Sequence, residues 1–168
     1  MQDRFSEGIL KLLLEIGHTT VEHHDDYEAR SNHVWASTLA LNGLIGVGVP
    51  QDWATHVIGH EITALTHIAH GRTLAIVLPS LLEVCKADKF EKLLQYARRV
   101  WHITEGTDEE KVDAAIGKTR EFFGSLGVPT RLSQYGIERE AIDTLVNQLK
   151  EHGRLKFGER GNITPAVS

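Results

Sequence analysis

Histidine is the residue type in this chain whose spacing indicates chemistry. The chain has 10 histidines among 168 residues, and four of them fall between positions 56 and 70. His56 and His60 are four residues apart on a segment with helical periodicity, so their side chains should leave one face about a turn apart. His67 is expected on the same face, and His70 at the helix end, where the chain can turn its ring back. Neutral imidazoles suit iron, zinc, copper or nickel, so we predict a metal site.

Most of the other histidines, and a possible zinc-protease motif, have simpler interpretations than a metal site. Histidines scattered elsewhere are more often surface or satisfied core residues, and this applies to His18, His23, His24, His33, His102 and His152. Within the cluster the interpretation reverses, because histidines placed among apolar residues at helical spacing would be costly to bury without a partner. A zinc-protease motif starting at His60 and Glu61 fails because Ala64 stands where the second histidine is required.

Two other chemical motifs are also excluded. Gly46 and Gly48 have the spacing that opens a dinucleotide fingerprint, but Pro50 follows, and no third glycine or preceding strand is found. The single cysteine, Cys85, has no base nearby in the sequence and is interpreted as an inert thiol.

The elements that must position the histidines are all predicted to be helices. No segment alternates with a period of two between turn signals. The fold class is therefore all-α, a helical bundle of about seven helices forming a single domain over residues 1–168. The expected helices span approximately 3–16, 25–44, 52–71, 73–83, 89–101, 107–127 and 138–152. Residues 154–168 are polar and glycine-containing, and are expected to form a loop.

Local signals define several of these helices. Gly17 should end the first helix, and Asp25 or Asp26 should cap the second. Thr107 and Glu110 form a capping box before the sixth helix. The residues expected on the inward face of the second helix are Val34, Trp35, Leu39 and Leu41. The apolar 73–83 segment should be buried on all sides and kinked at Pro79.

Composition excludes two classes of partner. The 23 acidic and 18 basic residues give a net charge of -5 and form no basic stripe, so nucleic acid is not an expected partner. The longest apolar run, Leu74 to Val84, is interrupted by Pro79 and is shorter than the roughly 20 residues that span a bilayer. With one cysteine and no apparent leader, a cytoplasmic location is expected.

The histidine region resembles a known family signature. The segment from Asp52 to Glu61, followed by Ala69-His70-Gly71 and then by Thr73 to Pro79, is similar to the signature of the iron-dependent (group III) alcohol dehydrogenases. Residues 41–43 and 94–97 also resemble the subgroup of NADPH-dependent aldehyde reductases and butanol dehydrogenases. The resemblance implies the C-terminal helical domain of that fold. It further implies that His56 and His70 bind a divalent metal, iron or zinc, while His60 stays unligated near the nicotinamide and the substrate.

Departures from the family pattern suggest a fragment. The resemblance implies an aspartate and a histidine, four residues apart, that complete the metal site, and a glycine-rich nucleotide-binding domain; neither is found here. We therefore expect part of an enzyme that interconverts aldehydes and primary alcohols, inactive alone, with NADP(H) bound mainly by the absent domain and a homodimer as the full-length assembly. The alternatives are a free-standing metal-binding or interaction module that uses His56, His60, His67 and His70 together, and a folded remnant that self-associates.

Overall fold

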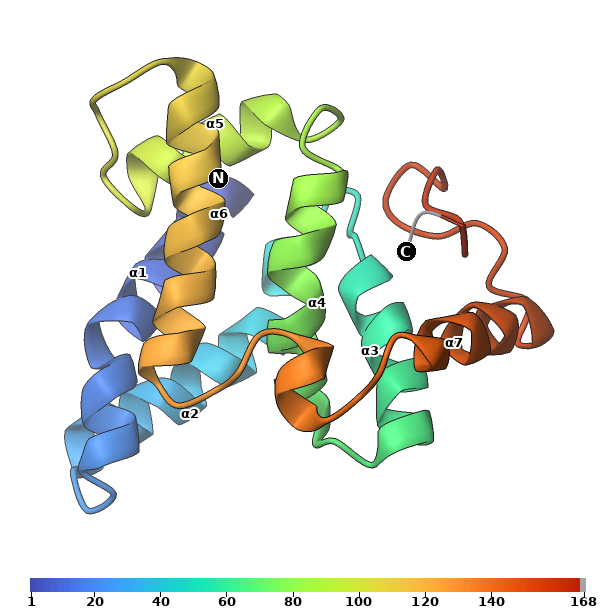
Figure 1. The fold of residues 1–168 in the computed structure, drawn as a ribbon. Helices are drawn as coiled ribbons and strands as arrows, with labels where there is room; N and C mark the ends of the chain where they lie inside the picture. The colour runs from blue at the N-terminus through green and yellow to red at the C-terminus, as the bar shows by residue number, and fades with distance from the viewer. Residues whose placement is uncertain (167–168) are drawn as a thin grey trace. The chain divides into compact units, whose positions relative to one another are not determined.

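The computed structural model describes residues 1–166, in which the regular secondary structure is helical apart from one isolated bridge (Figure 1). Within this range there are seven α-helices and two short 3-10 helices, which confirms the predicted all-α class. The contacts divide the chain into two compact units, residues 1–50 with 91–115 and residues 51–90 with 116–168. The single-domain assignment stays a prediction, and the last two residues of the predicted C-terminal loop lie outside the described range.

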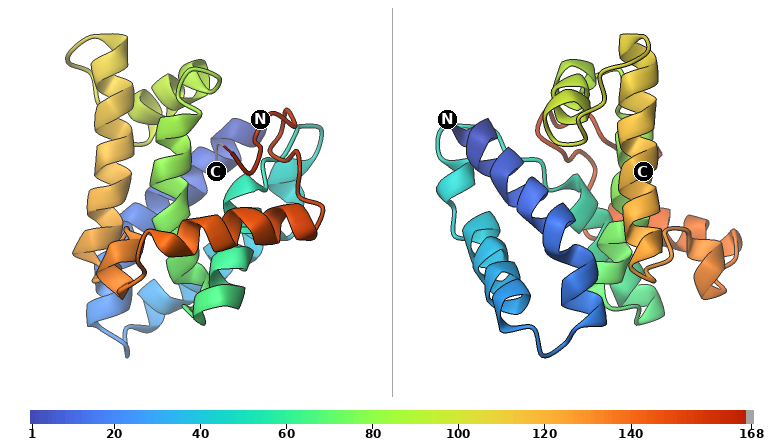
Figure 2. Two further views of the ribbon diagram at one scale, coloured as in Figure 1. Left: turned by 45° about the vertical axis from the view of Figure 1, so that its right-hand side comes forward. Right: turned by 90° about the vertical axis from the view of Figure 1, so that its left-hand side faces the viewer.

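The first unit is built on a pair of neighbouring helices, α1 (Gln2–Glu22) and α2 (Tyr27–Leu41), which a short turn joins (Figure 2). The prediction that Gly17 ends the first helix is wrong, because α1 continues to Glu22. Asp26 does cap α2, its carboxylate accepting a hydrogen bond from the Ala29 N–H at 2.9 Å. The short helix η1 (Leu44–Gly46) follows.

The inward face predicted for the second helix is wrong at three of its four residues. Val34, Trp35 and Leu41 are 64%, 62% and 71% exposed. The small residues Ala29 and Ala36 are buried instead, 5% and 1% exposed. Small side chains let helix backbones approach closely. The periodicity of large apolar residues does not show that the buried face of this helix is the one that carries small residues.

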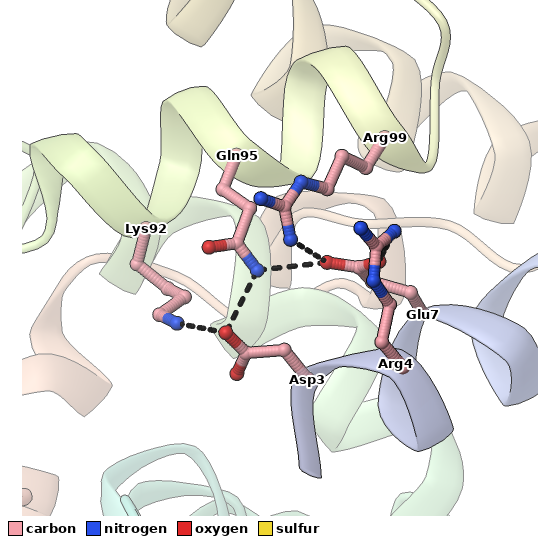
Figure 3. A network of polar contacts seen from close by, with 6 residues as sticks. All are labelled: Asp3, Arg4, Glu7, Lys92, Gln95 and Arg99. Carbon is pink, nitrogen blue, oxygen red and sulfur yellow. Dashed lines mark hydrogen bonds and ion pairs between the residues drawn. The ribbon is translucent and has the colours of Figure 1, made fainter. Parts of the chain in front are cut away.

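A polar network joins α1 to α5 (Phe90–Arg99) in the same unit (Figure 3). Glu7 is only 7% exposed and accepts hydrogen bonds from Gln95 at 2.7 Å and Arg99 at 3.1 Å. Asp3 accepts from Lys92 and Gln95. Burial by itself would raise the pKa of Glu7, but the hydrogen bonds from Gln95 and Arg99 lower it below its ordinary value. These charge-assisted bonds hold the two helices together.

The sixth helix starts where the capping box predicted. In α6 (Asp108–Ser125), the Thr107 N–H donates to Glu110 Oε2 at 2.7 Å and the Glu110 N–H donates to Thr107 Oγ1 at 3.2 Å. Two orphan donors at the helix N-terminus are thereby satisfied. The boundary between the two units falls within α6, after Ala115.

The second unit carries the histidine cluster. It contains α3 (Ala54–Thr66), α4 (His70–Val84), η2 (Leu132–Tyr135) and α7 (Glu140–Glu151), and α3 packs against both α4 and α7 (Figure 1). Helix α4 continues through Pro79. The buried core of the second unit is formed by Ala54, Ile62, Val77, Leu81, Cys85, Leu145, Leu149, Phe157 and Ile163.

The C-terminal loop belongs to this core. Phe157 and Ile163 exchange two backbone hydrogen bonds at 3.0 and 3.2 Å, and both side chains are buried. Lys89 donates to Asp52 at 2.8 Å and to Glu159 at 3.1 Å, so the loop is attached to Asp52, two residues before α3 begins. None of the helices in the described range is both long and apolar enough to cross a bilayer.

Candidate metal centre

Three histidines converge where α3 meets α4. The Nδ1 atom of His56 lies 3.2 Å from the Nε2 atom of His70. The ring of His60 stacks on that of His70, with centroids 4.2 Å apart and planes 12° apart. One ring nitrogen from each of the three lies within 4.8 Å of the others. The structure thus brings together all three histidines that the sequence assigned to the site.

Helix boundaries differ from the prediction in a way that matters for the site. A single helix from about Asp52 to Gly71 was expected, but α3 ends at Thr66 and His70 begins α4. His67 caps α3 in the left-handed conformation, with φ of 59°. It is exposed and lies outside the group of converging ligand atoms. His70 therefore reaches His56 from a second helix that packs on α3.

Gly59 permits the close approach of these two helices. A Cβ atom at this position would lie 3.0 Å from Thr73 Oγ1, 3.0 Å from Leu74 Cδ2 and 3.5 Å from His70 Cε1. The first two distances are shorter than most Cβ contacts in proteins, whereas the third is an ordinary van der Waals contact. Glycine therefore lets α3 and α4 approach closely at a position next to His60 and three residues after His56, and the sequence pattern alone did not single it out.

Thr73 supports the His70 ring from within α4. Its side chain is fully buried, and its Oγ1 donates to the His70 carbonyl at 2.8 Å. With its proton engaged there, the same oxygen can accept from the Nδ1–H of His70, which lies 3.5 Å away. A proton on Nδ1 leaves Nε2 of His70 as the lone-pair atom that faces His56. Such outer contacts orient metal-binding histidines in proteins generally.

Burial favours the neutral form of the two facing histidines. Desolvation lowers the pKa of His56, and the neighbouring His60 lowers it further. Desolvation likewise lowers the pKa of His70, assisted by His60 and His56. Only a neutral imidazole has a free lone pair to offer a cation, so the environment holds both rings in the form that can bind metal.

The pair has a separation that suits a bound cation. Two nitrogens held at about 2.1 Å from one tetrahedral zinc ion lie about 3.4 Å apart. The observed 3.2 Å between His56 Nδ1 and His70 Nε2 is close to this value. The separation of these two nitrogens is thus compatible with binding of one cation by both rings, which stand on two helices that pack together.

Glu61 does not take part in the cluster. Its carboxylate is 7% exposed and accepts from Nδ1 of His152 at 2.9 Å, which joins α3 to the end of α7. His152 was interpreted from the sequence as an ordinary histidine, and that pairing was not foreseen.

A cleft of about 630 Å³ also lies beside His56, lined by α4 residues and by Phe123 and Val128.

Comparison with known proteins identifies the family. Residues 1–157 match the model of the C-terminal part of the Fe-containing alcohol dehydrogenase family. The chain belongs to the iron-containing alcohol dehydrogenase family. It is 55% identical over 168 residues to the NADPH-dependent aldehyde reductase YqhD of Escherichia coli, and the match covers 100% of this chain and 43% of that protein. With NADH-dependent butanol dehydrogenase B of Clostridium acetobutylicum it is 40% identical, covering 98% of this chain and 42% of that protein.

Solved structures of the family give the same result. The substrate- and cofactor-free aldehyde reductase YqhD superposes with a TM-score of 0.96 at 54% identity, covering 99% of this chain and 44% of that one. The NADH-dependent butanol dehydrogenase A of Thermotoga maritima superposes with a TM-score of 0.85 at 33% identity, covering 89% of this chain and 37% of that one. The chain thus spans less than half the length of these relatives. The sequence-based assignment to the C-terminal helical part of the family is confirmed.

Proposed function

We propose that this chain is the metal-binding, helical part of an NADP(H)-dependent aldehyde reductase that interconverts aldehydes and primary alcohols. The observation that carries the proposal is the 3.2 Å approach of His56 Nδ1 and His70 Nε2 from two helices. Support comes also from the relatives, since one with 55% identity is an NADPH-dependent aldehyde reductase. Aldehydes and primary alcohols are thus the proposed substrates, and neither nucleic acid nor membrane is a proposed partner.

His56 and His70 are the proposed metal ligands, and iron and zinc are the candidate metals. A divalent cation bound there would supply a Lewis acid that polarises the oxygen of the substrate. The two rings contribute neutral nitrogens fixed by α3 and α4. Burial lowers both pKa values, which favours the neutral form that binds a cation. Thr73 keeps the His70 ring in the required orientation.

His60 is the proposed catalytic and cofactor-facing residue. It is exposed, while its ring stacks on that of His70 at 4.2 Å. An imidazole can accept a proton at one ring nitrogen and donate one from the other, so an exposed ring beside the metal ligands can pass a proton between the substrate oxygen and water. The stacking on His70 positions the His60 ring beside the proposed metal ligands.

The nicotinamide cofactor is proposed to bind mainly to a separate nucleotide-binding domain, with residues 1–168 acting as one helical domain beside it. The complete enzyme is proposed to be a cytoplasmic homodimer. The chain alone is then expected to bind metal weakly and to lack aldehyde reductase activity, because two histidines supply only half of a four-ligand site. Metal content and NADPH-dependent aldehyde reduction measured on the isolated chain test this expectation, and robust activity would overturn it.

A chimera tests the roles of the histidines. The preceding part of the Escherichia coli aldehyde reductase, joined ahead of this chain, should yield a metal-containing enzyme that oxidises NADPH with an aldehyde. His56→Ala and His70→Ala should each lose metal and activity together. His60→Ala should keep the metal and lose most of the activity, and His67→Ala should retain both. Loss of metal from His67→Ala would instead favour the four-histidine module.

A further inference from the structure

A second cleft lies in the same unit, away from the histidines. It has a volume of about 310 Å³ and lies between α3, α4, α7 and the segment that leads into η2. Apolar side chains from three helices form its walls, among them Ile58 and Ile62 of α3, Leu81 of α4, and Leu149 of α7. Clefts of this size with mostly apolar walls are typical small-molecule sites.

The cleft opens to solvent at an apolar rim. Ile142 and Val84, which both line it, are 43% and 55% exposed. Leu145 and Leu149 of α7 are buried, whereas Ile142 on the same helix stays at the surface beside the cleft. Large aliphatic side chains at such a rim form a favourable entry for an apolar ligand.

One charged residue lines this cleft within the described part of the chain, and it is Arg131. The loop that carries it is held in place, because the backbone N–H groups of Thr130 and Arg131 both donate to Gln134 Oε1 at 3.0 Å. The nearby Glu83 carboxylate is already paired with Arg120 at 3.3 Å. The one charged residue among those that line the cleft is therefore cationic, and hydrogen bonds hold its backbone in place.

We propose that this cleft binds a straight-chain monocarboxylate, with the alkyl chain between α3, α4 and α7 and the carboxylate against the Arg131 guanidinium. A guanidinium matches a carboxylate in both charge and geometry. The volume of the cleft, about 310 Å³, lies at the lower end of the range for small-molecule sites, which suits a ligand with one short alkyl chain. Octanoate is the representative ligand. The site is separate from His56, His60 and His70, and its occupation does not depend on the proposed reductase activity.

Calorimetric titration of the chain with octanoate tests the proposal. Saturable binding at one site is expected, and octan-1-ol should bind about tenfold more weakly because it lacks the charge. Arg131→Ala should weaken octanoate binding by a similar factor and leave octan-1-ol unaffected. Arg139→Ala, an exposed arginine that does not line the cleft, is the matched control and should change neither. Ile142→Trp should block both ligands at the rim.

Several outcomes would overturn the proposal. These are an absence of saturable binding, equal binding of the alcohol and the acid, or undiminished binding to Ile142→Trp. Val146→Phe provides a second way to fill the cleft if Ile142→Trp fails to fold. Sedimentation measurements test the remaining possible occupant, which is a second copy of the chain. The ligand assignment is wrong, and the cleft is a protein contact, if the chain dimerises and the dimer is broken by Ile142→Trp but not by octanoate.

Discussion

Replacing Gly59 by alanine should separate α3 from α4 and so disturb the histidine pair. The added Cβ would lie 3.0 Å from Thr73 Oγ1 and from Leu74 Cδ2. The Leu74 side chain can rotate away. Thr73 cannot, because it is fully buried and its hydroxyl is engaged with the His70 carbonyl at 2.8 Å. The strain must therefore be relieved by movement of the helix that carries His70.

The size of the effect follows from two opposing terms. Overpacking a well-packed core costs about 1–3 kcal/mol. Alanine is favoured over glycine within a helix by about 1 kcal/mol. Gly117, inside α6, isolates the second term, because a Cβ there would meet nothing within 4 Å. Gly117→Ala should therefore stabilise the chain, and Gly59→Ala should unfold about 1–3 kcal/mol more easily than Gly117→Ala.

Urea unfolding followed by far-ultraviolet circular dichroism measures this difference, provided that both variants show the same dependence on denaturant. In the chimeric enzyme, Gly59→Ala should also lower metal content, whereas Gly117→Ala should not. If the two alanine variants proved equally stable and equally rich in metal, the close approach at Gly59 would have no role in assembling the site.

Three further predictions concern residues outside the metal site. Glu7→Gln should destabilise the chain by about 1–3 kcal/mol at neutral pH. Because the folded-state pKa of Glu7 is lowered, the stability that its carboxylate contributes is present above the ordinary value of 4.5 and is lost as pH falls through the folded-state value. The unfolding curves of the variant and the original chain should therefore converge in acid. Thr107→Ala should cost about 1 kcal/mol by removing the cap on α6, measured by thermal unfolding, with the exposed Thr144→Ala as control. His152→Ala should cost about 1 kcal/mol, because Glu61 loses its partner on α7, and hydrogen exchange should rise in α7.

Much of the fold could be predicted from local chemistry. Periodicity of apolar residues predicted seven helices because each must bury one face. Caps at Asp26 and Thr107 were correct because a side-chain oxygen two or three residues before a helical N–H acts locally. Gly17 misled because packing along α1 outweighs the small helix propensity penalty of one glycine.

The candidate site was predicted in part. The spacing of His56 and His60 places them on one helical face in any fold, so their proximity follows from the sequence. The sequence placed His70 at the end of the same helix, where its ring could turn back, but in the structure His70 lies on a different helix and reaches His56 through helix packing. Its role as a metal ligand stays a prediction.

The sequence by itself determined the helical class and the family and indicated a group of histidines, because helical periodicity and residue spacing are local properties of the chain. Tertiary structure decided which faces are buried, how closely α3 and α4 approach at Gly59, and that Arg131 is among the residues that line an apolar cleft. These features depend on contacts between residues far apart in the chain, such as Gly59 with Thr73 and Glu61 with His152. Packing of α4 and α7 on α3 creates those contacts, and no local pattern encodes the distance at which the helices meet.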